Sequence, residues 1–269
     1  MLTSTPLVSI ITVSYNAIMS IEDTIISVIN QKYPNIEYII IDGGSNDGTV
    51  DIIKKYSNKI TYWISEPDSG IYDAMNKGIM IAKGEWINFM NCGDSFYDNS
   101  VIKTIFSNKI SSDVIYGNTC LLLKQGNYIV GPKELTIMKR QLPFYHQSSF
   151  VKTNLMKEFL FDTKYKICAD YNFFFHLWKK NYTFNYQNII ISNYNLLIYS
   201  LSNNSHFKAY CEKQLIIEGN KNIKYYLKTG KYYIRIKIGK ICSKLVSKHF
   251  LNRRREKQLS QHCTLLSKQ

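Results

Sequence analysis

The sequence predicts an α/β fold with a mostly parallel, doubly wound sheet, flanking helices and a basic helical extension at the C-terminal end. Two observations lead to this prediction. Over the first hundred residues, apolar β-branched runs alternate with segments of helical periodicity, the pattern of successive βαβ units. The run at 36–41 is apolar on both faces, as in a buried parallel strand, and it ends at Asp42 and two glycines.

Each expected element in the first hundred residues has its own sequence signal. The first helix, for example, repeats Ile21, Ile25 and Val28 on one face and begins at Ser20, a residue type that caps helices well. Together these signals place strands at 7–13, 36–42, 60–64 and 85–90, and helices at 20–31, 49–56 and 70–83.

After residue 94 the periodicity weakens and the expected elements become shorter. From residue 206 onward, aromatic, aliphatic and basic residues interleave at helical spacing, so we expect a domain over 1–205 and a basic helical extension over 206–269. The expected elements before the extension are helices at 102–110, 154–158 and 170–180, strands at 113–116 and 188–192, and a hairpin at 120–130.

The positive charge of the chain is concentrated in this extension. Residues 1–205 carry 18 Lys and Arg against 17 Asp and Glu, residues 206–269 carry 16 against 3, and the formal net charge is +14. A basic tail on a neutral body indicates an anionic partner for the tail. We expect the 221–257 segment to lie on an anionic membrane surface. A nucleic acid, or a solvated basic helix packed on the body, is the alternative.

The cysteines and the N-terminus bear on the compartment. The six cysteines are widely spaced and form no CxxC pair, which argues against a zinc site or a disulfide framework and favours a reducing compartment. The first residues do not resemble a signal peptide, and no window holds the roughly 18 apolar residues that a spanning helix needs. The sequence therefore predicts a cytoplasmic protein, peripheral at the inner face of the plasma membrane.

Polar residues follow the expected strands at the edge where parallel strands end and open α/β sheets bind ligands. The first strand leads into Tyr15, the second into Asp42 and the fourth into Asp94. Tyr15 can stack on a base, Asp42 can accept hydrogen bonds from a base or ribose, and Asp94 offers Mg²⁺ or Mn²⁺ a hard oxygen ligand. This pattern predicts a nucleotide site, although an ordinary strand-to-helix turn is the alternative for the segment after Asp42.

Four motifs in this order resemble those of the inverting family 2 glycosyltransferases with the GT-A fold, above all the bacterial members that assemble O-antigen, capsule and exopolysaccharide. The resemblance is dense over about residues 6–98, thinner to about 195 and absent beyond 205. The motifs are VSIITVSYN at 8–16, IDGGSNDGT at 41–49, IYDAMNKG at 71–78 and WINFMNCGD at 86–94.

The resemblance implies that the first two motifs bind the nucleotide part of a nucleotide-sugar. Thr12, Tyr15 and Asn16 are expected to line the nucleotide pocket together with Asp42. Gly43 is expected to let the backbone approach the ligand closely.

The third motif is expected to lie along the same cleft. By resemblance, Asn76 and Lys77 would help to hold phosphates, and Asp73, like Asp68 before the motif, would touch the donor or the acceptor. Met75 stands where the family commonly has an arginine.

The fourth motif occupies the position of the family's Asp-x-Asp metal site. Asp94 would ligate Mn²⁺ or Mg²⁺, the metal that neutralises the departing diphosphate. The first carboxylate is replaced by Asn91, which still offers a neutral oxygen but puts a strict metal requirement in doubt.

Two later segments resemble the family's acceptor side. His146 and Gln147 match a His-Gln-Ser segment near the donor sugar and its phosphates, and Asp170 matches the catalytic base. An inverting transfer needs one base to take the proton of the acceptor hydroxyl, because the leaving nucleoside diphosphate needs charge stabilisation instead of an acid. The alternative for Asp170 is a cap on the helix at 170–180.

The sequence therefore predicts an inverting glycosyltransferase that moves one sugar from a nucleotide-sugar, a UDP-hexose, to a lipid-diphosphate-linked saccharide. A dinucleotide-dependent oxidoreductase would show GxGxxG after the first strand, where this chain has no glycine. A nucleic-acid-binding protein that uses the basic tail lacks support from any RNP, KH or zinc-finger pattern. An inactive nucleotide-binding protein of GT-A type is the other alternative, because of Asn91 and Met75.

Overall fold

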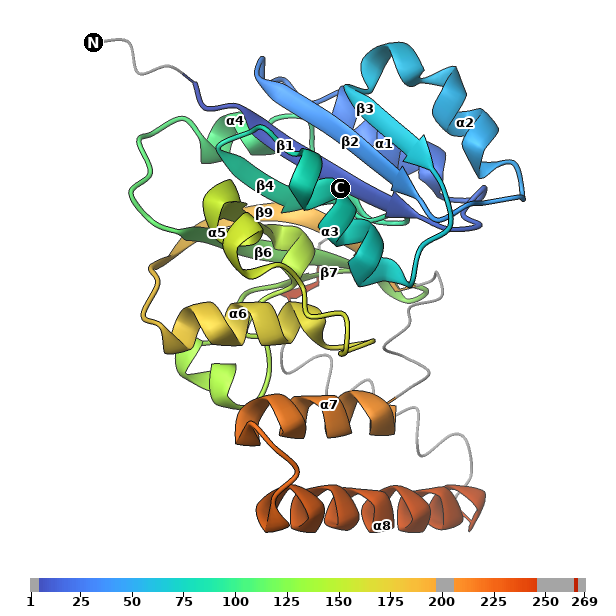
Figure 1. Cartoon of the computed structure of the whole chain (residues 1–269), viewed down its shortest axis with the longest axis vertical. Helices are drawn as coiled ribbons and strands as arrows, with labels where there is room; N and C mark the ends of the chain where they lie inside the picture. The colour runs from blue at the N-terminus through green and yellow to red at the C-terminus, as the bar shows by residue number, and fades with distance from the viewer. Residues whose placement is uncertain (1–4, 197–205, 246–263, 266–269) are drawn as a thin grey trace.

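The computed structural model describes residues 5–196, 206–245 and 264–265, and within these ranges the strands form a single mixed sheet flanked by helices (Figure 1). The strand order is β10-β7-β6-β8-β4-β1-β2-β3, with β9 beside β6 and β5 beside β9. The strands are β1 (Val8–Ser14), β2 (Ile36–Asp42), β3 (Tyr62–Ser65), β4 (Trp86–Phe89), β5 (Ser95–Phe96), β6 (Val114–Leu123), β7 (Gly126–Val130), β8 (Ser149–Lys152), β9 (Phe184–Asn195) and β10 (Thr264–Leu265).

Helices cover the sheet and continue beyond it. The α-helices are α1 (Ile21–Ile29), α2 (Thr49–Lys55), α3 (Ile71–Ile81), α4 (Val101–Ile105), α5 (Thr153–Phe159), α6 (Ala169–Lys179), α7 (His206–Glu218) and α8 (Ile223–Leu245). Three short 3₁₀ helices complete the described elements: η1 (Ser57–Lys59), η2 (Leu135–Lys139) and η3 (His146–Ser148).

The N-terminal half of the sheet is the predicted parallel array. β1 pairs in parallel with β4 on one side and β2 on the other, and β2 pairs in parallel with β3. Because the register sets Ser14 opposite Asp42 and Asp42 opposite Ser65, these strands end together at one edge. The structure thus confirms that the turns after β1, β2 and β4 share one edge of the sheet.

The second half of the sheet differs from the prediction of a mostly parallel array. β8 runs antiparallel to both β4 and β6, and β7 runs antiparallel to β6. β6 is also longer than the expected strand at 113–116. The sequence predicts a turn at Gly117 and the polar residues after it, but in the structure these residues continue the strand. A Cβ on Gly117 would lie 2.8 Å from the carbonyl oxygen of Ile189, so this close approach of β9 requires glycine.

The two faces of the sheet carry separate hydrophobic clusters. Val8 and Ile10 of β1 pack on one side with α1 and α4, whereas Ile11 and Val13 pack on the other with α3, α5 and α6. All four side chains are buried, and each buried aliphatic side chain contributes about 1.5–3 kcal/mol of transfer free energy. Burial on both faces explains why the parallel strands read as continuous apolar runs.

The start of the C-terminal extension forms two helices, as predicted. α7 packs against α6 and contributes the buried Ile216 to the same core as that helix, and α8 lies alongside α7 at the end of the molecule (Figure 1). Tyr210 of α7 and Tyr232 of α8 stack with ring centroids 3.9 Å apart. The expected boundary at 205 and the Arg253–Arg255 cluster lie outside the described residues. Across the described ranges, every helix is too short or too polar to span a bilayer.

Candidate active site

Asp42 organises the turn after β2. Its carboxylate accepts hydrogen bonds from the hydroxyls of Ser14 (2.8 Å), Ser45 (2.6 Å) and Ser65 (2.6 Å), and from the backbone N–H groups of Ser45 (2.8 Å) and Gly44 (3.2 Å). Burial raises the pKa of Asp42, but these bonds outweigh it and hold the pKa below its usual range. The side chain is fully buried, so Asp42 supports the cleft from below and does not face a base or ribose as expected.

Thr12 and Asn16 were also expected to line the nucleotide pocket, but their polar groups form hydrogen bonds to other parts of the protein. The fully buried Thr12 hydroxyl donates to the carbonyl oxygen of Met90 (2.8 Å), which places it in the core. Asn16 has a positive φ of 46°, a conformation that asparagine tolerates better than most residues. Its backbone N–H donates to Ser45 Oγ (2.8 Å) and its Oδ1 accepts from the backbone of Asn46 (3.1 Å), tying the first two turns together.

Tyr15 faces an open surface, whereas Gly43 is buried beneath Tyr15 and Asp68. The Tyr15 side chain is 65% exposed at the end of β1. A Cβ on Gly43 would lie 3.3 Å from the Tyr15 ring and 2.5 Å from Asp68 Oδ2. The missing side chain of Gly43 therefore lets an aromatic ring and a carboxylate approach the same stretch of backbone.

The third motif holds neighbouring segments in place. Asn76 Nδ2 donates to the carbonyl oxygen of Phe161 (2.8 Å) and its Oδ1 accepts the N–H of the same residue (2.8 Å). Lys77 Nζ forms an ion pair with Glu66 (2.7 Å), and Asp73 accepts the backbone N–H of Ser69 (3.0 Å). In this structure Asn76 and Lys77 thus support the walls of the cleft, and the role in holding phosphates stays a prediction.

The turn after β4 brings two oxygen-bearing side chains to the same edge. The Asp94 N–H donates to the carbonyl oxygen of Asn91 (3.0 Å), and Gly93 between them has a φ of +96°. Asn91 and Asp94 are 8% and 7% exposed. Burial raises the pKa of Asp94 to about 7, although the amide of Gln147 stabilises the charged form.

The 3₁₀ turn η3 delivers His146 and Gln147 to Asp94. The Asn88 amide donates to the carbonyl oxygens of Gln147 (2.9 Å) and Ser149 (2.8 Å), which fixes η3 against β4. Gln147 Nε2 then donates to Asp94 Oδ2 (2.9 Å). Gln147 therefore contacts the acidic residue of the fourth motif directly.

Asp170 lies in the first turn of α6 and faces the same pocket. The Tyr72 hydroxyl of α3 lies within hydrogen-bond distance of two acceptors, the carbonyl oxygen of Ile167 (2.8 Å) and Asp170 Oδ1 (3.1 Å), which share its single proton. Burial and the Asp170 charge raise the pKa of Tyr72 well above its usual value, so Tyr72 stays a neutral donor. Cys168 occupies the N-cap position of α6, so the alternative role of Asp170 as the cap is not supported.

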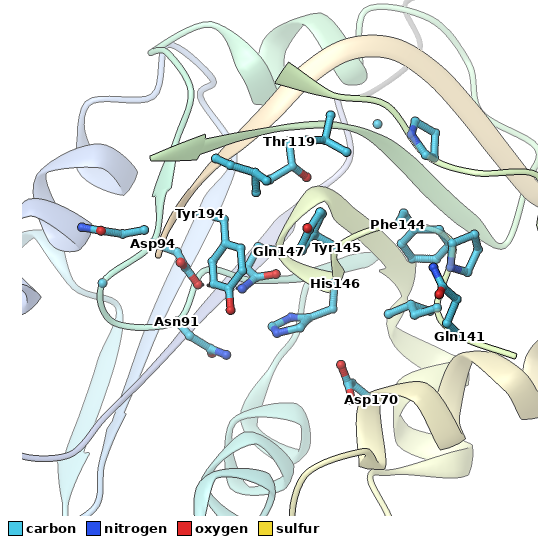
Figure 2. Close-up of a pocket in the computed structure, with 18 of the residues that line it drawn as sticks. Asn91, Asp94, Thr119, Gln141, Phe144, Tyr145, His146, Gln147, Asp170 and Tyr194 are labelled. Carbon is cyan, nitrogen blue, oxygen red and sulfur yellow. Dashed lines mark hydrogen bonds between the residues drawn. The ribbon is translucent and has the colours of Figure 1, made fainter. Parts of the chain in front are cut away.

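These groups line one pocket of about 740 Å³, in which His146 lies between Asn91 and Asp170 (Figure 2). Burial lowers the pKa of His146, while the Asp170 charge opposes the shift, so the imidazole is neutral near pH 7. Of the seven buried side-chain polar atoms that lack a hydrogen-bond partner among the described residues, three belong to this pocket: Asn91 Oδ1, Gln147 Oε1 and His146 Nδ1. Unpaired buried polar atoms are costly, so their gathering in one pocket is the mark of a binding site.

The residues present fit a divalent metal only in part. The Asp94 carboxylate and the unpaired Asn91 Oδ1 are oxygen ligands of the kind that Mn²⁺ and Mg²⁺ prefer, and a neighbouring cation would offset the cost of ionising Asp94. No group of three or more His, Cys, Asp or Glu side chains in the described ranges could hold a metal. A metal here would need oxygens from a ligand, as Mg²⁺ commonly takes from substrate phosphates.

Sequence reasoning missed four residues of this region. Tyr72 lies in the third motif, but the sequence analysis assigned roles only to Asp73, Asn76 and Lys77 there. Lys166, Glu212 and Lys213 come together only because α7 packs beside the loop before α6, and both lysines line the pocket. No local pattern signals that long-range contact.

Comparisons with known proteins agree with the fold and site. The profile described as glycosyl transferase family 2 matches residues 9–118. An uncharacterised glycosyltransferase of Mycobacterium tuberculosis is 34% identical over 182 residues, covering 64% of this chain and 69% of that protein. A PGL/p-HBAD biosynthesis glycosyltransferase of Mycobacterium bovis is 25% identical, covering 71% and 77%. The chain belongs to glycosyl transferase family 2, with relatives in cell-surface glycan synthesis.

Solved structures share the fold. The crystal structure of Staphylococcus aureus TarS 1–349 in complex with UDP-GlcNAc is 18% identical with a TM-score of 0.64, over 78% of this chain. The alignment spans 65% of that chain, less than two thirds of its length. The mannosyltransferase PcManGT of Pyrobaculum calidifontis, in complex with GDP-Man and Mn²⁺, is 14% identical with a TM-score of 0.62, over 86% of this chain and 70% of that one. Both likenesses support the GT-A type of fold.

Proposed function

We propose that this glycosyltransferase moves one hexose, with inversion, from a UDP-sugar to a lipid-linked saccharide in the synthesis of a bacterial surface polysaccharide. The observation that carries the proposal is the placement of Asp170 and the Asn91–Asp94 turn in a single pocket. One wall thus has a base for the acceptor, and another has oxygens for the leaving diphosphate. A purely structural cluster would pair the polar atoms of Asn91, His146 and Gln147 that are unpaired in this pocket.

Asp170 acts as the base of the transfer. Its carboxylate takes the proton of the acceptor hydroxyl as that oxygen bonds to the anomeric carbon, while the bond from this carbon to the diphosphate breaks on the opposite face. Tyr72 donates to one oxygen of Asp170, which holds the carboxylate toward the pocket and leaves the second oxygen for the proton. The neutral His146 between the two walls can donate one hydrogen bond and accept another.

Asp94 and Asn91 would hold the divalent metal, which supplies positive charge to the leaving diphosphate when bound. Gln147 keeps Asp94 oriented, because its amide donates to Oδ2 of the carboxylate. Charge stabilisation of this kind removes the need for a second acidic side chain at the leaving group.

The nucleotide lies on the surface formed by Tyr15 and Asp68, which pack over the buried Gly43. The exposed Tyr15 ring stacks on the base, and the absence of a side chain at Gly43 lets Tyr15 and Asp68 pack over the backbone there. Asp42 and Thr12 position this surface from beneath. The choice of UDP as the donor nucleotide is supported by the fold shared with TarS, whose structure was solved with UDP-GlcNAc.

The acceptor is reached at an anionic membrane, on which α8 docks at the inner face of the plasma membrane. One face of α8 packs on α7 through Tyr225, Thr229 and Tyr232. A second face presents exposed apolar side chains that share one stripe at helical spacing, and a row of basic residues lies beside it. The apolar stripe is Ile223, Tyr226, Leu227, Tyr233, Ile234 and Ile238, and the basic row is Lys224, Lys228, Lys231 and Arg235.

The charge of α8 matches an anionic lipid surface. The helix contains no acidic residue, and the only ion pairs described for its lysines join Lys224 and Lys228 to Glu218 of α7. Apolar burial and attraction to anionic lipids act together on such helices. The continuation of the expected 221–257 segment past 245 lies outside the described residues.

The function can be tested by measuring nucleotide release from UDP-Glc, UDP-Gal, UDP-GlcNAc, UDP-GalNAc, GDP-Man and dTDP-Rha, with Mn²⁺ or with EDTA. We expect metal-dependent release from one UDP-sugar. With a membrane extract as acceptor, Asp170→Asn should lower transfer by about 10²–10⁴-fold, because the base is lost. Tyr72→Phe should lower it less, since it only positions the base. Release and transfer that are unchanged in Asp170→Asn would contradict the proposal.

A further inference from the structure

Two lysines from distant parts of the chain stand at the Asp170 side of the pocket. Lys166 lies in the loop that precedes α6, and Lys213 lies on α7. Both line the same pocket as Asp170, and in that pocket Asp170 lies across His146 from Asn91 (Figure 2). Neither is part of the four motifs, and neither has been given a role above.

A single carboxylate fastens together the two segments that carry these lysines. Glu212 of α7 accepts three backbone N–H groups in succession, from Lys166 (3.0 Å), Ile167 (2.9 Å) and Cys168 (3.0 Å). The Cys168 thiol also donates to the carbonyl oxygen of Ala209 (3.4 Å). These bonds fasten the loop before Asp170 to α7, so the backbone of Lys166 is held against Glu212, the residue that precedes Lys213.

The local charges leave the two ammonium groups for another partner. Both carboxylate oxygens of Glu212 accept hydrogen bonds from backbone N–H groups. Within the described residues, neither Lys166 nor Lys213 forms an ion pair. Lys213 is half-buried. Burial and the Asp170 charge raise the pKa of the Cys168 thiol to about 12, and the positive charge of Lys213 opposes this shift. The charge of Lys213 therefore acts at the start of α6.

We propose that Lys166 and Lys213 form an anion subsite for the acceptor, which takes the phosphate or diphosphate of a lipid-linked saccharide. The inference rests on the proposed function, because it places the acceptor beside Asp170. The donor diphosphate belongs near Asp94, so these lysines are not needed for it. Compact ammonium groups suit phosphate as point charges. The C-terminal extension therefore completes the acceptor site.

The test is calorimetric titration of the full-length protein, saturated with UDP and Mn²⁺, with farnesyl diphosphate as the soluble prenyl diphosphate. We expect binding in the wild type, about tenfold weaker binding in Lys166→Gln and in Lys213→Gln, and about a hundredfold loss in the double variant. Lys213→Arg should restore most of the affinity, since it keeps the charge. The matched control is Lys208→Gln, an exposed lysine on α7 outside the pocket, which should bind as the wild type does.

Three results would overturn the subsite. Wild-type affinity in the double variant would show that the lysines do not contact the diphosphate. Displacement of UDP by farnesyl diphosphate would assign the lysines to the donor. Equally tight, lysine-dependent binding of glucuronate would assign them to an acidic sugar in place of a phosphate. UDP titrated alone keeps the two proposals apart, because a wild type that binds no nucleotide contradicts the proposed function without touching the lysines.

Discussion

Two neighbouring turns at the same edge of the sheet each hold a buried carboxylate, but the pKa is lowered in one turn and raised in the other. Asp42 after β2 accepts five hydrogen bonds, and its pKa is held below the usual range. Asp94, in the turn after β4, accepts one hydrogen bond from the side chain of Gln147 and one from the backbone of Asn195, and burial outweighs both and raises its pKa to about 7. The saturated carboxylate builds the fold, whereas the under-saturated one is available to a ligand.

The largest expected effect is on the saturated turn. Asp42→Asn replaces an anion that accepts five hydrogen bonds with a neutral amide that accepts fewer, and one of whose ends is itself a donor. We expect a loss of about 3 kcal/mol in the free energy of unfolding, measured by urea denaturation. A loss below about 1 kcal/mol would mean that the network around Asp42 contributes little to the fold.

The same substitution at Asp94 should have the opposite sign. In the metal-free protein at pH 7.5, Asp94→Asn removes a poorly compensated buried charge, so we expect the free energy of unfolding to stay constant or rise by about 1 kcal/mol. The pair of variants forms its own control, since both change one carboxylate to an amide at the sheet edge. A loss as large as that of Asp42→Asn would erase the contrast.

The pH dependence of stability sharpens the comparison. Because the folded pKa of Asp94 is raised from about 4 to about 7, its contribution to stability is full below the unfolded pKa and is lost as pH rises to 7. The folded pKa of Asp42 is lowered, so its contribution is present above the unfolded pKa and is lost in acid.

We therefore expect the difference in unfolding free energy between wild type and Asp94→Asn to change by about 1–4 kcal/mol from pH 4 to pH 7 in EDTA. The wild type should lose stability relative to the variant as pH rises. A difference that stays flat over this window would contradict the raised pKa of Asp94.

Mn²⁺ should act on one turn alone. At a concentration about tenfold above its Kd, Mn²⁺ with UDP should stabilise the wild type by about 1.4 kcal/mol beyond UDP alone, seen as a higher melting temperature. Asp94→Asn should show little of this increment. Ser65→Ala, which weakens the Asp42 network without touching the pocket, should keep it. Equal increments in all three proteins would place the metal elsewhere.

The smallest expected effect concerns α8, far from both turns. Ile234→Asp puts a negative charge in the exposed stripe, so it should weaken binding to phosphatidylserine-containing vesicles about tenfold in sedimentation assays. Met80→Asp, at an equally exposed apolar position on α3, is the matched control and should bind as the wild type does. Equal loss in both variants would mean a nonspecific charge effect.

Much of the fold was predictable because its signals are local. The strand at 36–42 was predicted with its observed bounds, and the shared edge of β1, β2 and β4 followed from parallel alternation. The antiparallel strands of the second half were harder, because the pairing of β8 with β4 and β6 depends on contacts between distant segments. The long β6 was hidden by Gly117, which reads as a turn.

The sequence predicted which residues lie at the site better than it predicted the orientation of their side chains. Asn91, Asp94, His146, Gln147 and Asp170 do meet in one pocket. Other motif residues are turned inward or paired with backbone, and a motif alone does not reveal which way a side chain points. Thr12, Asp42 and Asn76 are the examples.

The most direct test of the account is calorimetric titration of UDP into wild type, Asp94→Asn and Asp68→Asn, each with Mn²⁺ and with EDTA. The account predicts that Mn²⁺ strengthens UDP binding at least tenfold in the wild type and that Asp94→Asn loses this gain while still binding UDP. Asp68→Asn, altered on the nucleotide surface, should bind more weakly yet keep the Mn²⁺ gain. Full Mn²⁺ enhancement in Asp94→Asn would contradict the claim that the under-saturated turn is the one that acts on the diphosphate.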